Sequence, residues 1–394
     1  MSVYPDYLAF DVECSGATNG TFGNPFCDSN RLVVIGYGNV AGVDTRFVGD
    51  DRDSHVEKLR DFKESIQSVD LTVGFNWKFD AHWSRRYGIL LGSKNTWDCQ
   101  LAHFIIHDQQ QPLPSLEDCA SYYGLENKYI DIETEYWKKG IDNDQVPHDI
   151  LERRVTGDVR ITSQLFELQI DYLRRHPSKK RLIWVSCQDQ KCLAEMEWNG
   201  LKYDLQRSIE AGDKIRLQQK EIEAKLDDIV QVDRGIINWN SKDHLSAILF
   251  GGDIPCRYRE EYLFTYKDGS TATKSRWSER KITRERRLEP IDGTEYSKGG
   301  VYSTDAQTIS RLKPRDPETK KILTHIKEYR KLDKKVGTYY HGLPKLYKEM
   351  GWTNSVIHGQ LQSAVTATGR LSSKGPNQQN MDHDIRQCIV SRFQ

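Results

Sequence analysis

The chain has 394 residues, a length that predicts two or three domains. Hydrophobic residues make up 37% of it, the mean hydropathy is −0.70, and no apolar run approaches the roughly 18 residues of a membrane span, so we expect no membrane partner. Its eight cysteines include no Cys-x-x-Cys pair, which argues against a zinc site or a disulfide scaffold. With no visible signal peptide, we expect a cytoplasmic protein that is not secreted.

The net charge is zero, but the charges are unevenly distributed. Residues 1–160 hold 26 acidic against 16 basic residues, which leaves 31 acidic against 41 basic residues in 161–394. An acidic N-terminal part and a basic C-terminal part suit a metal-binding domain joined to a nucleic-acid clamp. Charges scattered over solvated faces explain the same balance equally well.

Short β-rich runs alternate with helical stretches in the first half. The expected strands are 7–12, 32–38, 45–48 and 71–75, and the expected helices are 54–68, 79–87, 98–107, 116–123 and 159–175. This alternation predicts an α/β domain over a mixed sheet.

From about residue 186 the pattern becomes helical. A helix is expected from Asp204 to about residue 230, and a second one begins at Asp316 and Pro317, with apolar residues at helical steps and a basic opposite face. Between them, residues 256–300 have the character of an insertion. Asp268 and Gly269 predict a hairpin turn there, and 274–287 holds seven basic against two acidic residues.

Three short segments carry acids in a suggestive pattern. Asp11 and Glu13 lie two apart on a predicted strand, so their side chains share one face. Asn76 and Asp80 lie four apart and share one side of a helix, and Asp158 stands at the head of another. Each acid alone is more readily a helix cap or a surface charge. Asp11 and Glu13 projecting together would be costly unless cations neutralise them.

The end of the chain carries the most specific pattern. Residues 366–373 read Thr-Ala-Thr-Gly-Arg-Leu-Ser-Ser and are followed by Pro376 and Asn377. This resembles the start of the palm domain in family A DNA polymerases, meaning bacterial DNA polymerase I and its phage relatives. Residues 192–204 and 237–250 resemble the thumb of the same family. In that family the first catalytic aspartate of nucleotide addition follows the palm segment, so we expect the front part of a polymerase.

The resemblance implies a domain plan. Residues 1–185 would form a ribonuclease H-like 3′–5′ exonuclease domain with a mixed sheet. Residues 186–350 would form a mainly helical thumb region with a basic hairpin-like insertion at about 256–300. Residues 351–394 would be an incomplete N-terminal segment of the polymerase palm.

The same resemblance assigns roles to residues. The acids resemble the DEDD proofreading exonucleases, which makes Asp11, Glu13, Asp80 and Asp158 the expected catalytic residues and ligands of two Mg²⁺ or Mn²⁺ ions. The implied partners are a primer–template DNA duplex, a single-stranded 3′ end and a complementary polymerase chain that carries the rest of palm and fingers. The expected nucleic-acid contacts are Asn76, Lys331, Lys334, Arg370, Asn377, Gln379 and Asn380.

One departure from the family weakens the nuclease prediction. A tyrosine that orients water lies four residues before the third-motif aspartate in this family, and the other DEDD subclass has a histidine five before it. Here these positions are Arg154 and Arg153, so we expect weakened hydrolysis. Two alternatives stay open: a free-standing DEDD exonuclease acting on DNA or RNA, and a non-catalytic DNA clamp whose nuclease site has decayed.

Overall fold

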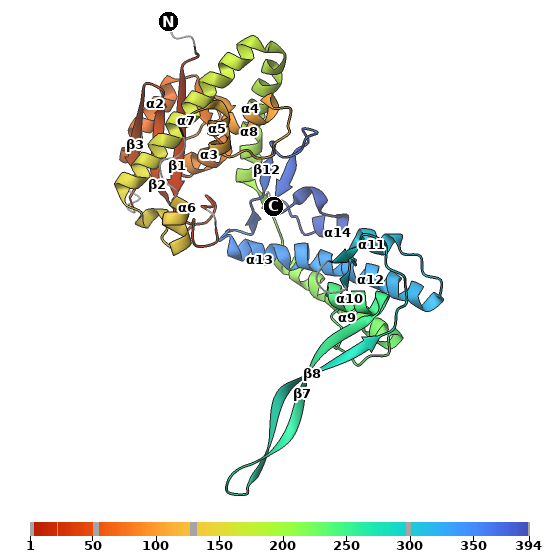
Figure 1. Ribbon diagram of the computed structural model, residues 1–394. Coiled ribbons are helices and arrows are strands. Elements are labelled where there is room, and N and C mark those ends of the chain that lie inside the picture. Colours follow the sequence, from red (N-terminus) through yellow and green to blue (C-terminus); the bar gives the residue numbers. More distant parts are fainter. Residues whose placement is uncertain (1–3, 22, 50–54, 127–131, 297–300, 393–394) are drawn as a thin grey trace. The chain divides into compact units, whose positions relative to one another are not determined.

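The computed structural model describes residues 4–21, 23–49, 55–126, 132–296 and 301–392 (Figure 1). The chain divides into two compact units. Unit 1 comprises Met1–Leu205 and Leu343–Gln394, and unit 2 comprises Gln206–Gly342. The last fifty or so residues thus belong to the same unit as the N-terminal part of the chain.

A five-stranded mixed sheet forms the centre of unit 1. Its strands lie in the order β3-β2-β1-β4-β5, with β1 in the middle, antiparallel to β2 and parallel to β4. The predicted mixed α/β architecture is therefore confirmed, and β5 is a strand that the sequence pattern missed. The bounds are β1 (Tyr7–Cys14), β2 (Leu32–Asn39), β3 (Gly42–Phe47), β4 (Leu71–Gly74) and β5 (Asn95–Asp98).

Helices cover this sheet, and their apolar sides form its core. The long helix α7 crosses the sheet (Figure 1) and contacts β1, β2 and β3. The helices from the N-terminus to α8 are α1 (His55–Lys58), α2 (Arg60–Ser68), α3 (Trp77–Arg86), α4 (Cys99–Ile106), α5 (Leu116–Tyr123), α6 (Ile132–Glu135), α7 (His148–Arg175) and α8 (Lys180–Asn199).

Two helix predictions need correction. Helix α7 begins at His148 instead of 159, because Leu151 and Val155 are fully buried against β2 residues and this packing outweighs the weak helix propensity of the Thr-Gly pair at 156–157. The helix expected over 54–68 is two helices, α1 and α2, and its first residue lies outside the described residues.

The C-terminal segment adds two small sheets to unit 1. Strand β11 (Val356–Ile357) pairs with β6 (Leu201–Lys202), and β12 (Gln360–Gln362) pairs with β13 (Ser372–Lys374). Helix α14 (His383–Arg386) follows, and α13 (Gly342–Glu349) leads into the segment. Strand β12 contacts α8, and Leu113 N–H donates to the carbonyl oxygen of Ala364 at 2.8 Å.

Unit 2 is mainly helical. Its buried core lies between α9 (Leu205–Ile229), α10 (Lys242–Phe250), α11 (Ala306–Arg311) and α12 (Pro317–Lys335). Asp316 caps α12 as expected, since its Oδ1 accepts the Thr319 N–H at 2.7 Å. The apolar repeat continues past α12 into a π-helical turn, Val336–Tyr340, before α13 begins. Short strands β9 (Glu295–Tyr296) and β10 (Val301–Tyr302) pair beside α10.

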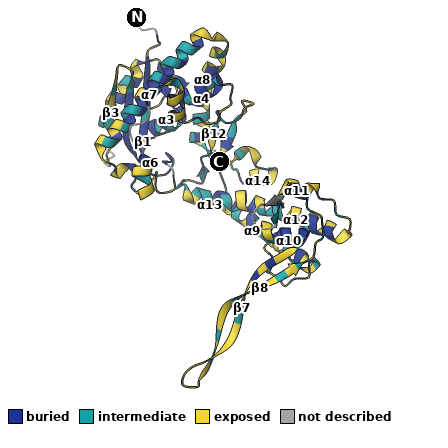
Figure 2. Ribbon diagram, in the orientation of Figure 1, coloured by how far each residue is buried: buried dark blue, intermediate teal, exposed yellow. Residues whose placement is uncertain are grey.

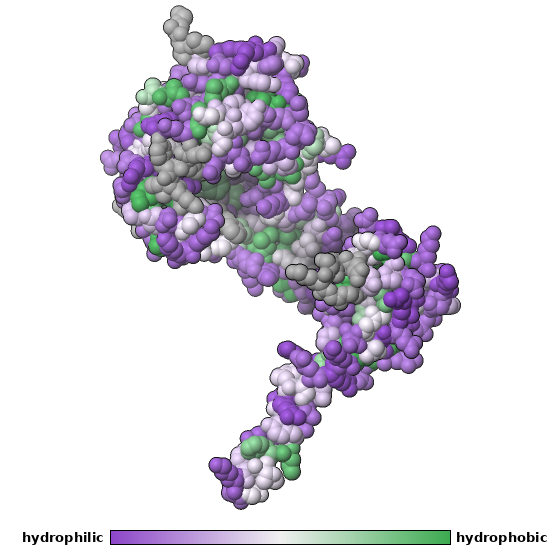
Figure 3. All heavy atoms as spheres, viewed as in Figure 1, coloured by the Kyte–Doolittle hydropathy of each residue, from purple (hydrophilic) through white to green (hydrophobic). Residues whose placement is uncertain are grey.

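A long two-stranded ribbon extends from unit 2. Strands β7 (Gly252–Thr265) and β8 (Thr271–Arg284) pair in continuous antiparallel register, and the predicted turn at Asp268 and Gly269 joins them. Figure 2 shows that most of the ribbon is exposed, and Figure 3 shows hydrophobic surface near its end, where Leu263 is 69% exposed. Among the described residues, no helix has the length and apolarity needed to cross a bilayer.

Candidate metal centre

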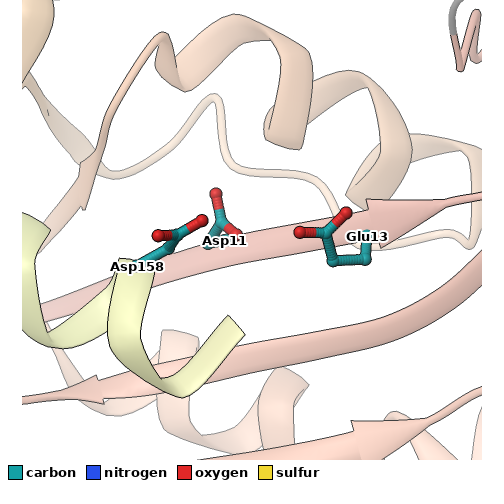
Figure 4. A group of neighbouring side chains, drawn as sticks. All are labelled: Asp11, Glu13 and Asp158. Atoms are coloured by element: carbon teal, nitrogen blue, oxygen red, sulfur yellow. The ribbon is translucent and has the colours of Figure 1, made fainter. Parts of the chain in front are cut away.

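The central strand β1 presents two carboxylates on one face. Asp11 and Glu13 lie two residues apart, and alternate residues of a strand point to the same side of its sheet. Figure 4 shows both side chains on the same side of β1. Glu13 is buried, whereas Asp11 is half-buried. Ionised carboxylates in such positions cost free energy unless cations or hydrogen-bond donors compensate them.

Helix α7 brings a third carboxylate to the same place. Asp158 is buried on α7, and one oxygen each of Asp11, Glu13 and Asp158 lies within 4.8 Å of the other two (Figure 4). Gly36 on β2 permits this approach, because a Cβ at that position would stand 2.9 Å from Cγ2 of Val155 on α7. Hard divalent cations bind carboxylate oxygens at about 2.0–2.6 Å, so three oxygens with this spacing can surround one such ion.

Asp80 joins the cluster from α3. Its Oδ1 accepts the backbone N–H of Val12 on β1 at 3.3 Å, and its side chain is buried. Burial, and then the negative charge of Asp11, raise the pKa of Asp80 well above its ordinary value, while the Val12 N–H opposes them. All four acids that the sequence analysis selected line one cavity. Their catalytic and ligand roles stay predictions.

Asp98 holds the turn from which α3 starts. One of its oxygens accepts the N–H of Asn76 at 3.2 Å and the other accepts the N–H of Trp77 at 3.1 Å. The same carboxylate caps α4 through the N–H groups of Gln100 and Leu101. Burial raises the pKa of Asp98, and these four N–H donors counteract part of that rise. Asp98 therefore fixes the turn that orients Asp80 toward β1.

Both oxygens of Glu13 already have donors from the protein. Arg154 Nε on α7 donates to Oε1, and Asn143 Nδ2 donates to Oε2 at 3.0 Å. Burial alone would lower the pKa of the Arg154 guanidinium. The negative charges of Glu13, Asp158 and Asp11 outweigh burial and hold that pKa above its ordinary value. Arg154 is therefore a permanent cation inside the acidic cluster.

The cavity around these groups has a volume of about 720 Å³, within the range of small-molecule sites. Asn76 lines it and has the left-handed backbone φ of 58° just before α3, and its contact with a nucleic acid stays a prediction. Phe75, Leu116 and Trp137 give it apolar walls, and Lys138 adds a second cation to its lining.

The remaining predicted contacts lie elsewhere on the chain. Lys331 and Lys334 are exposed on α12 in unit 2. In unit 1 four polar residues are exposed near β13, outside the acidic cavity: Arg370, Asn377, Gln379 and Asn380. Gln379 Nε2 donates to the carbonyl oxygen of Leu371 at 2.9 Å. Their role in nucleic-acid binding stays a prediction.

The sequence analysis missed two residues that complete the cavity. Asn143 and Trp137 come from short 3₁₀ turns, Asn143–Gln145 and Trp137–Lys139, in a stretch without periodicity. Nothing in the sequence relates Asn143 to Glu13, 130 positions earlier. The one local signal is Asp142, whose carboxylate accepts the N–H of Gly16 at 2.8 Å and of Ala17 at 3.2 Å and so ties this turn to the loop after β1.

Comparisons with known proteins relate the chain to DNA polymerases. The profile of DNA polymerase family A matches residues 279–393. DNA polymerase I of Bacillus subtilis (strain 168) is 26% identical over 342 residues, which are 84% of this chain and 32% of that protein. The enzyme of Bacillus caldotenax is 28% identical over 227 residues, 56% of this chain and 21% of that protein. The chain thus spans a third or less of the length of these curated relatives.

Solved structures include a similar fold. The POL domain of Pol1 from M. smegmatis, in complex with DNA primer-template and dNTP, superposes with a TM-score of 0.63 at 17% identity and covers 97% of this chain and 54% of that one. Residues 279–393 are thus similar to DNA polymerase family A, and the curated relatives named above are bacterial DNA polymerases I.

Proposed function

We propose that this chain is the front part of a DNA-directed DNA polymerase whose first 185 residues are a ribonuclease H-like, metal-dependent 3′–5′ exonuclease acting on DNA. The observation that carries the proposal is the convergence of Asp11, Glu13 and Asp158, with oxygens within 4.8 Å of one another, beside the buried Asp80. The mixed sheet with β1 at its centre and α7 across it supports the assignment.

The reaction is hydrolysis of the last phosphodiester bond of a DNA strand. Water oxygen attacks phosphorus, the bond to the 3′-oxygen breaks, and that oxygen takes up a proton, so a nucleoside monophosphate leaves the strand. A divalent metal bound at this site would supply activation of the water and neutralisation of the charge on the leaving oxygen. The carboxylates of Asp11, Glu13 and Asp158 would hold the cation, and Asp98 keeps Asp80 aimed at the same place through the turn before α3.

The lining of the cavity fits a nucleotide as well as a metal. Asn76 offers an amide at its rim, and Lys138 offers a cation that matches a phosphate. Phe75 and Leu116 supply apolar surface on which a base or sugar can pack. An unpaired 3′ end suits this site better than a duplex, because its terminal base is free to leave the stack.

A double substitution tests the nuclease proposal. Asp11→Ala with Glu13→Ala should abolish the Mg²⁺- or Mn²⁺-dependent shortening of a labelled single-stranded oligonucleotide. Asp149→Ala is the matched control, because Asp149 is an exposed acid of α7 that pairs with Arg153 outside the cavity. If the double variant digests DNA as fast as the control, the assignment of the active site is wrong.

The rest of the chain serves DNA binding in the same proposal. Lys331 and Lys334 contact the backbone of a primer–template duplex, and Arg370, Asn377, Gln379 and Asn380 contact its minor groove, where polar donors test pairing without reading sequence. Asp382 caps α14 by accepting the Ile385 N–H at 3.2 Å. A complementary chain with the remaining palm and fingers would supply nucleotide addition. A phage source stays a prediction.

The pairing of Arg154 with Glu13 favours a second candidate, a DNA clamp without nuclease activity. In that case the full chain retains an oligonucleotide in a gel-shift assay and leaves it intact after prolonged incubation with Mn²⁺. Digestion under those conditions rules the clamp out.

A further inference from the structure

The guanidinium of Arg154 lies inside the acidic cluster that is proposed to bind divalent cations. Arg154 precedes Asp158 by four residues, so both side chains leave α7 on the same face. Its Nε donates to Oε1 of Glu13, and its side chain is 15% exposed. Arg154, Asp11, Glu13 and Asp158 all line the same cavity.

A chain of contacts holds the guanidinium in this place. It lies over the ring of Trp137, 5.7 Å from the ring centroid. Trp137 Nε1 donates to Oδ1 of Asn143 at 2.9 Å, and Asn143 Nδ2 donates to Glu13 Oε2 at 3.0 Å and to the carbonyl oxygen of Cys14 at 2.9 Å. Glu13 is therefore enclosed between Arg154 and Asn143, and each partner is anchored by a further contact.

These contacts do not fit the two ions that the sequence analysis expected. A second divalent ion about 4 Å from the first needs carboxylate oxygens of its own. One oxygen of Glu13 is already bound to Arg154, and a further divalent charge would stand next to a guanidinium that never deprotonates. Like charges at this distance repel, and the Arg154 side chain is only 15% exposed, which weakens the screening by solvent. The oxygens of Asp11, Glu13 and Asp158 fit one ion, because a carboxylate oxygen that accepts one hydrogen bond keeps a second lone pair.

We propose that this site binds a single divalent cation and that the Arg154 guanidinium takes the place of the second as a fixed positive charge. The inference rests on the proposed nuclease function, in which both positive charges face the phosphate that is cleaved. The number of bound divalent ions distinguishes this site from a two-ion centre. That number can be measured without any catalytic activity.

Counting bound Mn²⁺ in the full chain tests the inference. Electron paramagnetic resonance measures the free aquated ion during titration, and two ions about 4 Å apart also give a spin-coupled spectrum that one ion cannot give. The parent should bind one Mn²⁺ at the site. Arg154→Met, which keeps an unbranched side chain beside Trp137 and removes the charge, should bind two.

Two further variants separate the charge of Arg154 from its bulk. Arg154→Lys keeps a cation and should still bind one ion. Arg153→Met removes a neighbouring cation that is exposed and pairs with Asp149, and should also bind one. Circular dichroism of each variant confirms that it is folded before the ions are counted. Asp11→Ala in the parent gives the background from ions bound outside the site.

The outcomes distinguish this inference from the nuclease proposal. Two ions in the parent, or one ion in Arg154→Met, overturn the inference and leave a metal-dependent nuclease standing. If the parent and every Arg variant bind no more Mn²⁺ than Asp11→Ala does, the metal centre is wrong, and the inference is wrong with it. The inference is established if the parent, Arg154→Lys and Arg153→Met each bind one ion and Arg154→Met binds two spin-coupled ions.

Discussion

Replacing Glu197 with glutamine should destabilise unit 1 more than any exposed charge substitution. Glu197 lies on α8 and is only 5% exposed. Its Oε1 accepts from Lys78 Nζ at 2.5 Å and from the Leu361 N–H at 2.6 Å, and its Oε2 lies 2.8 Å from His82 Nε2. Through these contacts one carboxylate joins α3, α8 and the C-terminal strand β12.

The size of the effect follows from the buried charges. Burial raises the pKa of Glu197, but His82, Lys78 and the Leu361 N–H outweigh it and lower that pKa below its ordinary value, so the ionised form is the one that the fold stabilises. Glutamine keeps the volume and leaves the Lys78 ammonium, 9% exposed, without its counter-ion. Breaking a buried ion pair in this way costs about 3–5 kcal/mol. For a unit of this size the melting temperature should fall by roughly 6–20 °C.

Thermal and urea unfolding, followed by circular dichroism, measure this loss. Glu195→Gln on the same helix is the control, because Glu195 is 59% exposed and pairs with Arg85 at the surface. Lys78→Met combined with Glu197→Gln should recover part of the stability, since it removes the uncompensated charge. Amide hydrogen exchange at Leu361 should also accelerate in Glu197→Gln. A Glu197→Gln variant within about 1 kcal/mol of the control would refute the reasoning, because exposed pairs contribute no more than that.

Three other expectations concern stability, DNA binding and polymerisation. Burial and the neighbouring His107 lower the pKa of His103 to about 4. As the pH falls, His103 is therefore protonated near pH 6.5 in the unfolded chain but only near pH 4 in the folded chain. Stability should therefore be full above pH 6.5 and decline by up to about 3 kcal/mol toward pH 4, and His103→Gln should flatten this decline in urea titrations. Replacing 258–278 with Asn-Gly should reduce the salt dependence of primer–template binding by about one unit of log–log slope for each phosphate contact removed; an unchanged slope would show that the ribbon does not touch DNA. The purified 394-residue chain should extend no primer with dNTPs and Mg²⁺, and a gel that shows extension would contradict the proposal that nucleotide addition needs further palm and fingers residues.

The sequence was most informative where periodicity and family pattern agree. Asp11 and Glu13 share a strand face, whereas Asp158 lies within the facing helix α7 and not at its head, where the sequence analysis places it. The Asp316 cap and the Asp268-Gly269 turn also lie where local chemistry places them. In each of these cases the relevant interaction spans only a few residues, or the strand period alone decides it.

Contacts between segments far apart in the sequence could not be predicted from hydrophobic periodicity or motifs. Strand β5 was missed because four residues, Asn95–Asp98, give too short a run to show alternation. Nothing in the sequence relates Asn143 to Glu13, or Glu197 to Lys78 across 119 positions. The replacement of a tyrosine by Arg154 was visible from the family pattern, but its ion pair with Glu13 needed the packing of α7 on the sheet.

The polarity and metal dependence of digestion test the central claim most directly. A single-stranded oligonucleotide labelled at its 5′ end is incubated with the full chain and Mg²⁺ or Mn²⁺, in parallel with EDTA and with the Asp158→Asn variant. Stepwise shortening from the 3′ end that needs the metal ion and is lost in Asp158→Asn is the predicted result. An intact oligonucleotide with Mn²⁺ and excess protein, or equal digestion by the variant, would contradict the assignment of a 3′–5′ exonuclease to this site.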